Sequence, residues 1–255
     1  GKNTFGYQAH PNVVTSLELE RLLSGTGPSQ GRLVRPSDGK PVRKMAWIQC
    51  VGSRDLHTEA DFCSSICCMV AIKEALLAKE KSPTDLETTI YYMDMRTFGK
   101  GFQRYRQQAE EIHGVRFERA RIHSVVQDEN SRELVLRSVN LSGAIQKTRI
   151  DMVVLTVGQR PSSGIRELAE MLSLELNTWG FGQTEPFSLT RSGRPGIVLG
   201  GSFAGIKDIS DSIIQSSAAA LNASRVIHST GGTLAMEYPP PDPAVDLLPE
   251  IPIIF

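Results

Sequence analysis

The chain has 255 residues, with 28 Lys and Arg against 28 Asp and Glu, so its formal net charge is zero. A neutral chain lacks the basic excess that non-specific binding to nucleic acid or to an anionic membrane surface needs, so we expect neither partner. No apolar run reaches the ~18 residues of a membrane span, and the first residues lack the apolar region of a signal peptide. We therefore expect a globular protein without direct membrane insertion.

The first 43 residues predict one short helix followed by loops. The helix covers residues 15–23, is capped by Thr15 or Ser16, and has Glu18 in its first turn. A stretch rich in Gly, Pro and Ser follows over residues 24–31 and predicts a loop.

From residue 44 onward, the pattern predicts strands and helices that alternate. Apolar strands are expected at residues 45–51 and 88–93, and a third opens at Val115. Helices are expected at residues 62–79 and 102–113. This alternation predicts a parallel sheet of the α/β class.

The next part of the chain predicts a different style of sheet. Residues 133–137, 145–150 and 152–157 predict a β-meander with short polar turns. After it we expect a helix at 165–172, a glycine-rich strand at 196–201 and a long helix at 210–227. Residues 230–255 carry a run of prolines that predicts a linker or an extended arm.

The cysteines form one tight cluster with the spacing Cys50-x12-Cys63-x3-Cys67-Cys68. A secreted disulfide framework would spread its cysteines along the chain, so the cluster predicts a metal site in a reducing, cytoplasmic setting. Cys50 ends a predicted strand, and Cys63 and Cys67 are one turn apart in the predicted helix. We expect the four thiols to meet at the carboxyl end of the sheet, where ligands of open α/β sheets bind.

The spacing favours an iron–sulfur cluster over a single metal ion. Zinc sites with four cysteines usually use two short Cys-x2–4-Cys pairs, whereas adjacent Cys67 and Cys68 suit a cubane, in which each thiolate binds a different iron. We therefore expect a [4Fe–4S] cluster. A zinc ion, or redox-active or structural thiols, remain the alternatives.

Five segments resemble one known family, the A-type iron–sulfur flavoprotein of heterodisulfide reductase. The cysteine motifs IQCVGSRD (residues 48–55) and FCSSICCMVAIK (residues 62–73) carry the resemblance most specifically. It continues in YMDMRTFGKG (92–101), VLTVGQRP (154–161) and KDISDS (207–212). Relatives of this family include the flavoproteins of quinone-interacting membrane-bound oxidoreductases.

The resemblance implies an oxidoreductase that passes electrons between FAD, a [4Fe–4S] cluster and other electron-transfer subunits of a heterodisulfide-reductase-like complex. The cluster would be held by Cys50, Cys63, Cys67 and Cys68. The implied fold is α/β and thioredoxin-reductase-like: a Rossmann-like nucleotide-binding domain with a parallel sheet and a β-meander, plus a partial FAD domain. Alternatives are an NAD(P)H-dependent disulfide-type oxidoreductase with Cys67 or Cys68 as redox thiols, and a zinc-binding structural module. A homodimer is left open.

The resemblance also implies a division of the chain. Residues 1–43 would be a return segment of the FAD domain, 44–157 the Rossmann-like domain with the cysteines, 158–229 the C-terminal part of the FAD domain, and 230–255 a tail. The GxGxxG motif that holds the FAD pyrophosphate is missing, so we expect a fragment or a split-gene product with an incomplete FAD site. In the second domain CVGSR replaces the glycine fingerprint, so we expect no tight nicotinamide binding.

Several residues are candidates for flavin chemistry. Lys73 is predicted to approach flavin N5, and Glu20 to relay a proton, unless both are ordinary surface residues. Asp94 follows a predicted strand, as a ribose-binding acid or a turn residue would. The amides of Asp211 and Ser212 are predicted to face the flavin, unless Ser210 or Asp211 merely caps the helix. The full set of predicted FAD contacts is Gly158, Pro161, Gly201, Ser202, Asp208, Asp211 and Ser212.

Overall fold

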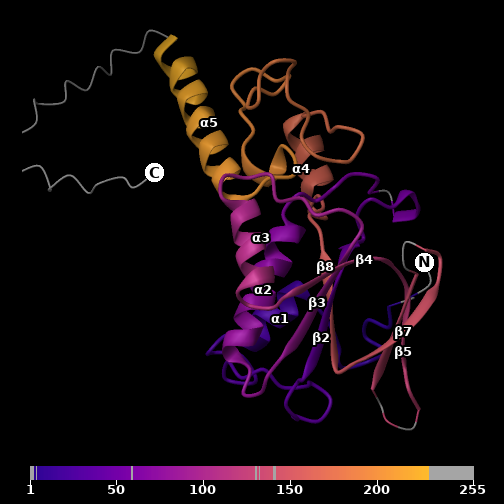
Figure 1. The fold of residues 1–255 in the computed structure, drawn as a ribbon. Coiled ribbons are helices and arrows are strands. Elements are labelled where there is room, and N and C mark those ends of the chain that lie inside the picture. The colour runs from indigo at the N-terminus through magenta and orange to yellow at the C-terminus, as the bar shows by residue number, and fades with distance from the viewer. Residues whose placement is uncertain are drawn as a thin grey trace, which may run out of the picture.

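The computed structural model describes residue 3 and residues 5–58, 60–129, 131, 133–139 and 142–229. The predicted tail at residues 230–255 lies outside the described part. The fold contains a five-stranded sheet of order β1-β8-β2-β3-β4 and a three-stranded sheet of order β5-β6-β7. Helices cover one face of the larger sheet, and the smaller sheet lies against the other face (Figure 1).

The larger sheet is parallel at every pairing. Its strands are β1 (Val13–Thr15), β8 (Met152–Val157), β2 (Lys44–Val51), β3 (Glu87–Tyr92) and β4 (Arg116–Arg119). The central strands β2 and β8 are buried along most of their length, as continuous apolar runs in parallel sheets usually are. The α/β fold with a parallel sheet is therefore confirmed.

Three helices pack on one face of this sheet: α1 (Ser16–Leu23), α2 (Cys67–Lys81) and α3 (Phe102–Glu111). Their apolar side chains join Trp47, Met152 and Val154 in one core. The predicted cap of α1 is confirmed, because the Thr15 hydroxyl accepts from the Glu18 amide at 3.3 Å while Glu18 Oε2 accepts from the Thr15 amide at 2.7 Å. This reciprocal arrangement satisfies two amides at the helix start.

The smaller sheet is an antiparallel meander of β5 (Arg121–Gln127), β6 (Leu134–Val139) and β7 (Ile145–Ile150). The predicted meander is therefore wrong in one strand. Residues 152–157 form β8 of the parallel sheet, and the third strand of the meander is formed by residues 121–127 instead. The continuous apolar run of β8 suits a strand buried on both faces. Together with Ala46, Ile48 and Tyr91 of the larger sheet, the meander buries the second core.

The remainder of the described chain lies beyond the carboxyl ends of the parallel strands (Figure 1). It holds α4 (Ile165–Leu172), the short 3-10 helix η2 (Gly201–Phe203) and α5 (Ile209–Ser229). The predicted strand at 196–201 is wrong: Val198 forms only an isolated bridge with Arg191, and Gly196 and Gly201 have φ values of 84° and 59° that no strand allows. No helix among the described residues is both long and apolar enough to cross a membrane.

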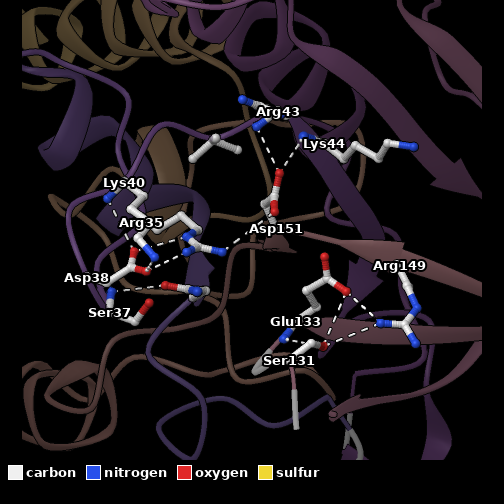
Figure 2. A network of polar contacts seen from close by, with 12 residues as sticks. Arg35, Ser37, Asp38, Lys40, Arg43, Lys44, Ser131, Glu133, Arg149 and Asp151 are labelled. Atoms are coloured by element: carbon white, nitrogen blue, oxygen red, sulfur yellow. Dashed lines mark hydrogen bonds and ion pairs between the residues drawn. The ribbon is translucent and has the colours of Figure 1, made fainter.

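A polar network fixes the opposite end of the sheet (Figure 2). Asp151, just before β8, accepts hydrogen bonds from the amides of Arg43 and Lys44 at 2.9 Å each and lies 3.7 Å from the Arg35 guanidinium. These contacts tie the starts of β2 and β8 together. The loops that carry the cysteines lie at the other end of the sheet, at the carboxyl ends of the parallel strands.

Candidate metal and cofactor site

The four cysteines gather where β2 ends and α2 begins. Cys50 lies near the end of β2, Cys63 lies in the following loop, and Cys67 and Cys68 open α2. All four are free thiols; Cys67 and Cys68 are buried and the other two partly so. The charges of the other cysteines help to raise the pKa of Cys50 and of Cys67. Both ends of the motif lie at the junction of β2 and α2, and their joining in one metal site stays a prediction.

The local backbone differs from the predicted helix. Because α2 begins at Cys67, Cys63 does not share a helical face with it, and that prediction is wrong. Ser65, with a φ of 62°, breaks the helix, and its amide donates to Cys63 Sγ at 3.3 Å. Cys50 is also left-handed, with a φ of 61°, at a register shift in the pairing of β2 with β8. Such a bulge redirects a side chain out of the regular strand pattern.

The surroundings of the thiols have opposing effects on their ionisation. Burial raises the pKa of Cys50 against the lowering effect of Arg54. A hydrogen bond between the two neighbours raises the pKa of Cys67 and lowers that of Cys68. Ile66, the N-cap of α2, offers no side-chain cap, so the positive end of the helix dipole favours a thiolate there.

The donor set consists of four thiols, two of them adjacent in the sequence. No group of three or more His, Cys, Asp or Glu side chains that could hold a metal ion is found among the described residues, so a cluster here stays a prediction. A zinc ion would need its sulfur ligands all about 2.3 Å from one point. A cubane accepts more widely spaced thiolates, because each one binds a different iron. Four free thiols, one of them already receiving an N–H···S hydrogen bond, provide the ligands that such a cluster uses.

An arginine and aspartate network borders the thiols. Arg54, which lowers the pKa of Cys50, pairs with Asp94, whose other carboxylate oxygen accepts from Arg96 Nε at 3.1 Å. Burial would raise the pKa of Asp94, but the two arginines outweigh it and hold that pKa below its ordinary value. With both oxygens engaged by guanidinium groups, Asp94 does not present a free carboxylate to a ribose.

Aromatic side chains from the C-terminal part clamp the cysteine loop. Phe62, next to Cys63, packs edge-on against Trp179 and Phe181 with centroid distances of 5.8 and 5.9 Å. Trp179 Nε1 also donates to Asp61 Oδ1 at 2.7 Å. No local sequence pattern reveals this contact across more than a hundred residues, and sequence analysis missed both Trp179 and Phe181.

Gly158 and Pro161 lie near this clamp. A Cβ on Gly158 would stand 1.7 Å from Ser64 Oγ, so this glycine is required by close packing against the cysteine loop. Pro161 lines a small pocket of about 370 Å³ together with Phe62 and Trp179. The structure thus brings both residues to the cysteine loop, and their predicted FAD contacts remain predictions.

A larger cavity of about 910 Å³ opens between α2, the loop before α3 and the start of α5. This volume lies within the usual range of ligand pockets, so the cavity can accept a planar cofactor ring. It brings together four of the predicted FAD contacts, whereas Gly201 lies outside its lining. The predicted residues on its wall are Ser202, Asp208, Asp211 and Ser212, and other wall residues include Met69, Arg96, Phe98, Phe102 and Gln159.

The start of α5 is closed by an acidic cap. Asp208 Oδ1 accepts from the Asp211 amide at 2.7 Å, and the Asp208 carbonyl accepts from the Ser212 amide at 3.0 Å. Asp208 is therefore the cap of α5. The sequence pattern offers Ser210 or Asp211 for this position. Neither of the two amides predicted to face a flavin is free, and the first-turn residues Ile209 and Ser210 line the cavity instead.

Lys73 and Glu20 lie together, since the Lys73 ammonium on α2 pairs with the Glu20 carboxylate on α1. Both are partly exposed, and neither belongs to the cavity wall. Lys73 follows Met69, a wall residue, by one helical turn. The neighbouring Glu74 was missed by sequence analysis: it is fully buried, accepts from Trp47 Nε1 at 2.9 Å, and burial raises its pKa to about 8.

No family model matches the chain, but curated proteins do. It is 40% identical over 239 residues to an iron–sulfur subunit of the CoB–CoM heterodisulfide reductase of Methanopyrus kandleri, covering 92% of this chain and 36% of that protein. It is 41% identical over 222 residues to the corresponding iron–sulfur subunit from Methanocaldococcus jannaschii, covering 86% of this chain and 34% of the relative. The chain thus spans about a third of the length of these relatives.

Solved structures of thioredoxin reductases share the fold. The Lactococcus lactis enzyme aligns with a TM-score of 0.55 and 16% identity over 90% of this chain and 63% of that one. The T. acidophilum enzyme aligns with a TM-score of 0.50 and 14% identity over 87% of this chain and 58% of that one. These similarities confirm the predicted thioredoxin-reductase-like fold class.

Proposed function

Because this chain belongs to the A-type iron–sulfur subunit family of heterodisulfide reductases, we propose that it is an electron-transfer part of an iron–sulfur flavoprotein. It would pass electrons between FAD, a [4Fe–4S] cluster and partner subunits of a heterodisulfide-reductase-like complex. The observation that carries this proposal is the gathering of all four cysteines, as free thiols, beside a cavity of about 910 Å³. An oxidoreductase role for this chain in the cytoplasm follows from the same proposal.

The cysteine segment and the cavity share a wall. Ser65 and Ile66 line the cavity and directly precede Cys67, while Met69 and Val70 line it from the next turn of α2. When bound, FAD supplies two-electron chemistry and the cluster one-electron chemistry. The apolar side chains of this shared wall would exclude water from the bound flavin ring. No other helix or strand would then separate the ring from the cysteine segment.

The residues at the cavity ends have proposed roles of their own. Ser202 and Gln159 would hydrogen-bond the bound ring, and Gln159 is held in place by two hydrogen bonds to the Lys207 backbone, at 2.8 and 3.0 Å. Lys73, one turn beyond Met69, would hold a positive charge near the reduced ring. Glu20 would keep that ammonium in place and accept or return its proton.

The decisive experiment measures iron and acid-labile sulfide per chain after strictly anaerobic purification. We expect about four of each, together with a broad visible absorbance that bleaches on reduction. Cys63→Ser should lower the iron content clearly, because it removes one ligand. Ser162→Ala, an exposed serine in the smaller pocket, serves as the control and should leave the iron content unchanged.

Other outcomes would favour the other interpretations of the motif. One zinc per chain and no iron would favour a structural module. Neither metal, together with tight binding of NADH measured by calorimetry, would favour a nicotinamide-dependent enzyme with redox thiols. Either result would contradict the proposal, and so would a Cys63→Ser variant that retains full iron.

A further inference from the structure

The smaller pocket, of about 370 Å³, lies beside the cysteine loop and apart from the larger cavity. Its wall is formed by Phe62, by residues between 160 and 166 around the start of α4, and by the segment around Trp179. The linings of the two cavities share no residue. The volume is at the low end of the range of ligand pockets, so the pocket suits a small ligand with one ring system.

The wall of the smaller pocket is positively charged. It carries Arg160 and Arg166, and among the described residues that line it there is no Asp or Glu. Arg160 Nη2 donates to the Gly52 carbonyl at 2.9 Å, which holds this side chain against the cysteine loop. Within the described chain neither arginine is paired with a carboxylate. Two like charges on one wall without a counter-ion favour the binding of an anion.

Two serines add hydrogen-bond donors to the same wall. Ser162 and Ser163 line the pocket, and their exposed hydroxyls have no partner within the described chain. Guanidinium groups bind phosphate oxygens two at a time, and serine hydroxyls can donate to the oxygens that remain. A phosphate monoester carries about two negative charges at neutral pH. It therefore matches two arginines better than a carboxylate, which carries one.

Another part of the wall is aromatic and accessible. Phe62 and Trp179 both line the pocket, and their rings meet edge-on with a centroid distance of 5.8 Å. The indole N–H of Trp179 donates to Asp61 at 2.7 Å, which fixes the ring, yet 46% of the residue remains exposed. A fixed and accessible indole offers a flat surface on which a planar ring can stack.

We propose that the smaller pocket binds a planar aromatic molecule that carries one phosphate group, about the size of a mononucleotide. Arg160 and Arg166 hold the phosphate, and Trp179 holds the ring. The site is additional to the proposed cluster and flavin sites and depends on neither. Because Phe62 belongs to the pocket wall and directly precedes Cys63, an occupied pocket also steadies the cysteine loop.

The first test titrates the full chain with AMP as the probe, by calorimetry and by tryptophan fluorescence. We expect a dissociation constant below about 1 mM and a change in emission. Trp179→Phe should remove most of that change but retain the heat, because the only other tryptophan, Trp47, is buried in the core. Adenosine and inorganic phosphate, each of which lacks one half of the probe, should bind at least severalfold more weakly than AMP.

The second test locates the bound probe by substitution. Arg166→Gln should fold normally, because this exposed side chain has no partner within the described chain, and should weaken AMP binding about tenfold. Arg225→Gln, which removes an exposed arginine of α5, makes the same change of charge outside the pocket and should leave the affinity unchanged. Arg96→Gln, on the wall of the larger cavity, should also leave it unchanged.

Three results would overturn the inference. The first is the absence of heat at millimolar AMP, and the second is adenosine or phosphate that binds as tightly as AMP. The third is a loss of affinity in Arg96→Gln but not in Arg166→Gln, because the probe would then lie in the larger cavity. None of these results bears on the iron content, so the proposed function is tested separately.

Discussion

Glu74 places a carboxyl group inside the main core of the protein. Its side chain is fully buried on α2, and one of its oxygens accepts from Trp47 while the other has no partner among the described residues. Burial raises the pKa of this carboxyl from 4.5 to about 8, with a further raising effect from Glu20 and a lowering effect from Lys73. The group is therefore uncharged in the folded protein at neutral pH, as a carboxyl without a paired cation in a core should be.

This predicts a pH-dependent stability that one substitution removes. Since the folded pKa lies above the unfolded one, the contribution of Glu74 to stability is full below pH 4.5 and is lost as the pH rises toward about 8. The slope over that window is at most about 1.4 kcal/mol per pH unit. Glu74→Gln should flatten it and unfold later in urea than the wild type at pH 8. The exposed Glu80→Gln is the control, and an equal slope in Glu74→Gln would contradict the assignment.

At this scale the sequence predicts the ligands but not their surroundings. The spacing of the cysteines indicates one shared site, because adjacent and clustered thiols have few other uses. It does not indicate that Asp94 engages Arg54 or that Trp179 reaches Asp61, since these pairs form only when distant segments meet. A helix start attracts anions, which favours a ligand at the amides of Asp211 and Ser212, yet Asp208 already occupies them.

At the scale of elements, left-handed residues decide where α2 begins. The apolar periodicity of residues 62–79 continues through the cysteine motif, so pattern alone extends the helix too far. Ser65 adopts a left-handed conformation, which costs about 1–3 kcal/mol in a residue other than glycine. This conformation interrupts the helical backbone, so α2 begins at Cys67. The sequence likewise predicts β8 as a strand but places it in the wrong sheet, because pairing partners are a tertiary property.

The contact between Gly158 and the cysteine loop makes a testable claim about two elements. Gly158→Ala should destabilise the protein by about 1–3 kcal/mol, the usual cost of overpacking, because the new Cβ meets Ser64 at 1.7 Å. Adding Ser64→Gly should restore stability, since the next neighbour, Ser53 Oγ, stands at an ordinary 3.4 Å. Gly164→Ala, with no atom within 4 Å, is the control. Urea denaturation checks all three, and a double variant no better than the single one would rule the contact out.

At the scale of the whole molecule, the central strands of the described chain are well buried, whereas its last helix is largely exposed. Two cores, one on each face of the parallel sheet, hold β2 and β8 between them. In contrast, α5 extends away from both sheets (Figure 1) and exposes Ile209, Ile213 and Ile214 by 81%, 62% and 68%. Gln215 and Asn222 hold it to the chain before it through hydrogen bonds to Leu189 and Thr190.

This contrast predicts a gradient of local stability. Hydrogen exchange measured by mass spectrometry should show the strongest protection in β2 and β8 and early exchange in α5, because amides with few buried contacts around them open locally. The effect should be independent of protein concentration. Protection of α5 that matches the central strands, or that grows with concentration, would show that another surface covers its isoleucines.

The position of β8 also has a consequence for how the chain is made. During synthesis β1 and α1 leave the ribosome before the other strands of the larger sheet, yet among the described residues β1 pairs with β8 alone, about 140 residues later. Until β8 is synthesised, the backbone hydrogen-bonding groups on the facing edges of β1 and β2 have no strand to pair with. Contacts this distant in sequence slow folding, and unpaired edges of nascent chains invite association with other chains. The last strand of the sheet to be synthesised is thus the one that closes it, and slow translation before residue 152 should lengthen the time that the nascent chain needs a chaperone.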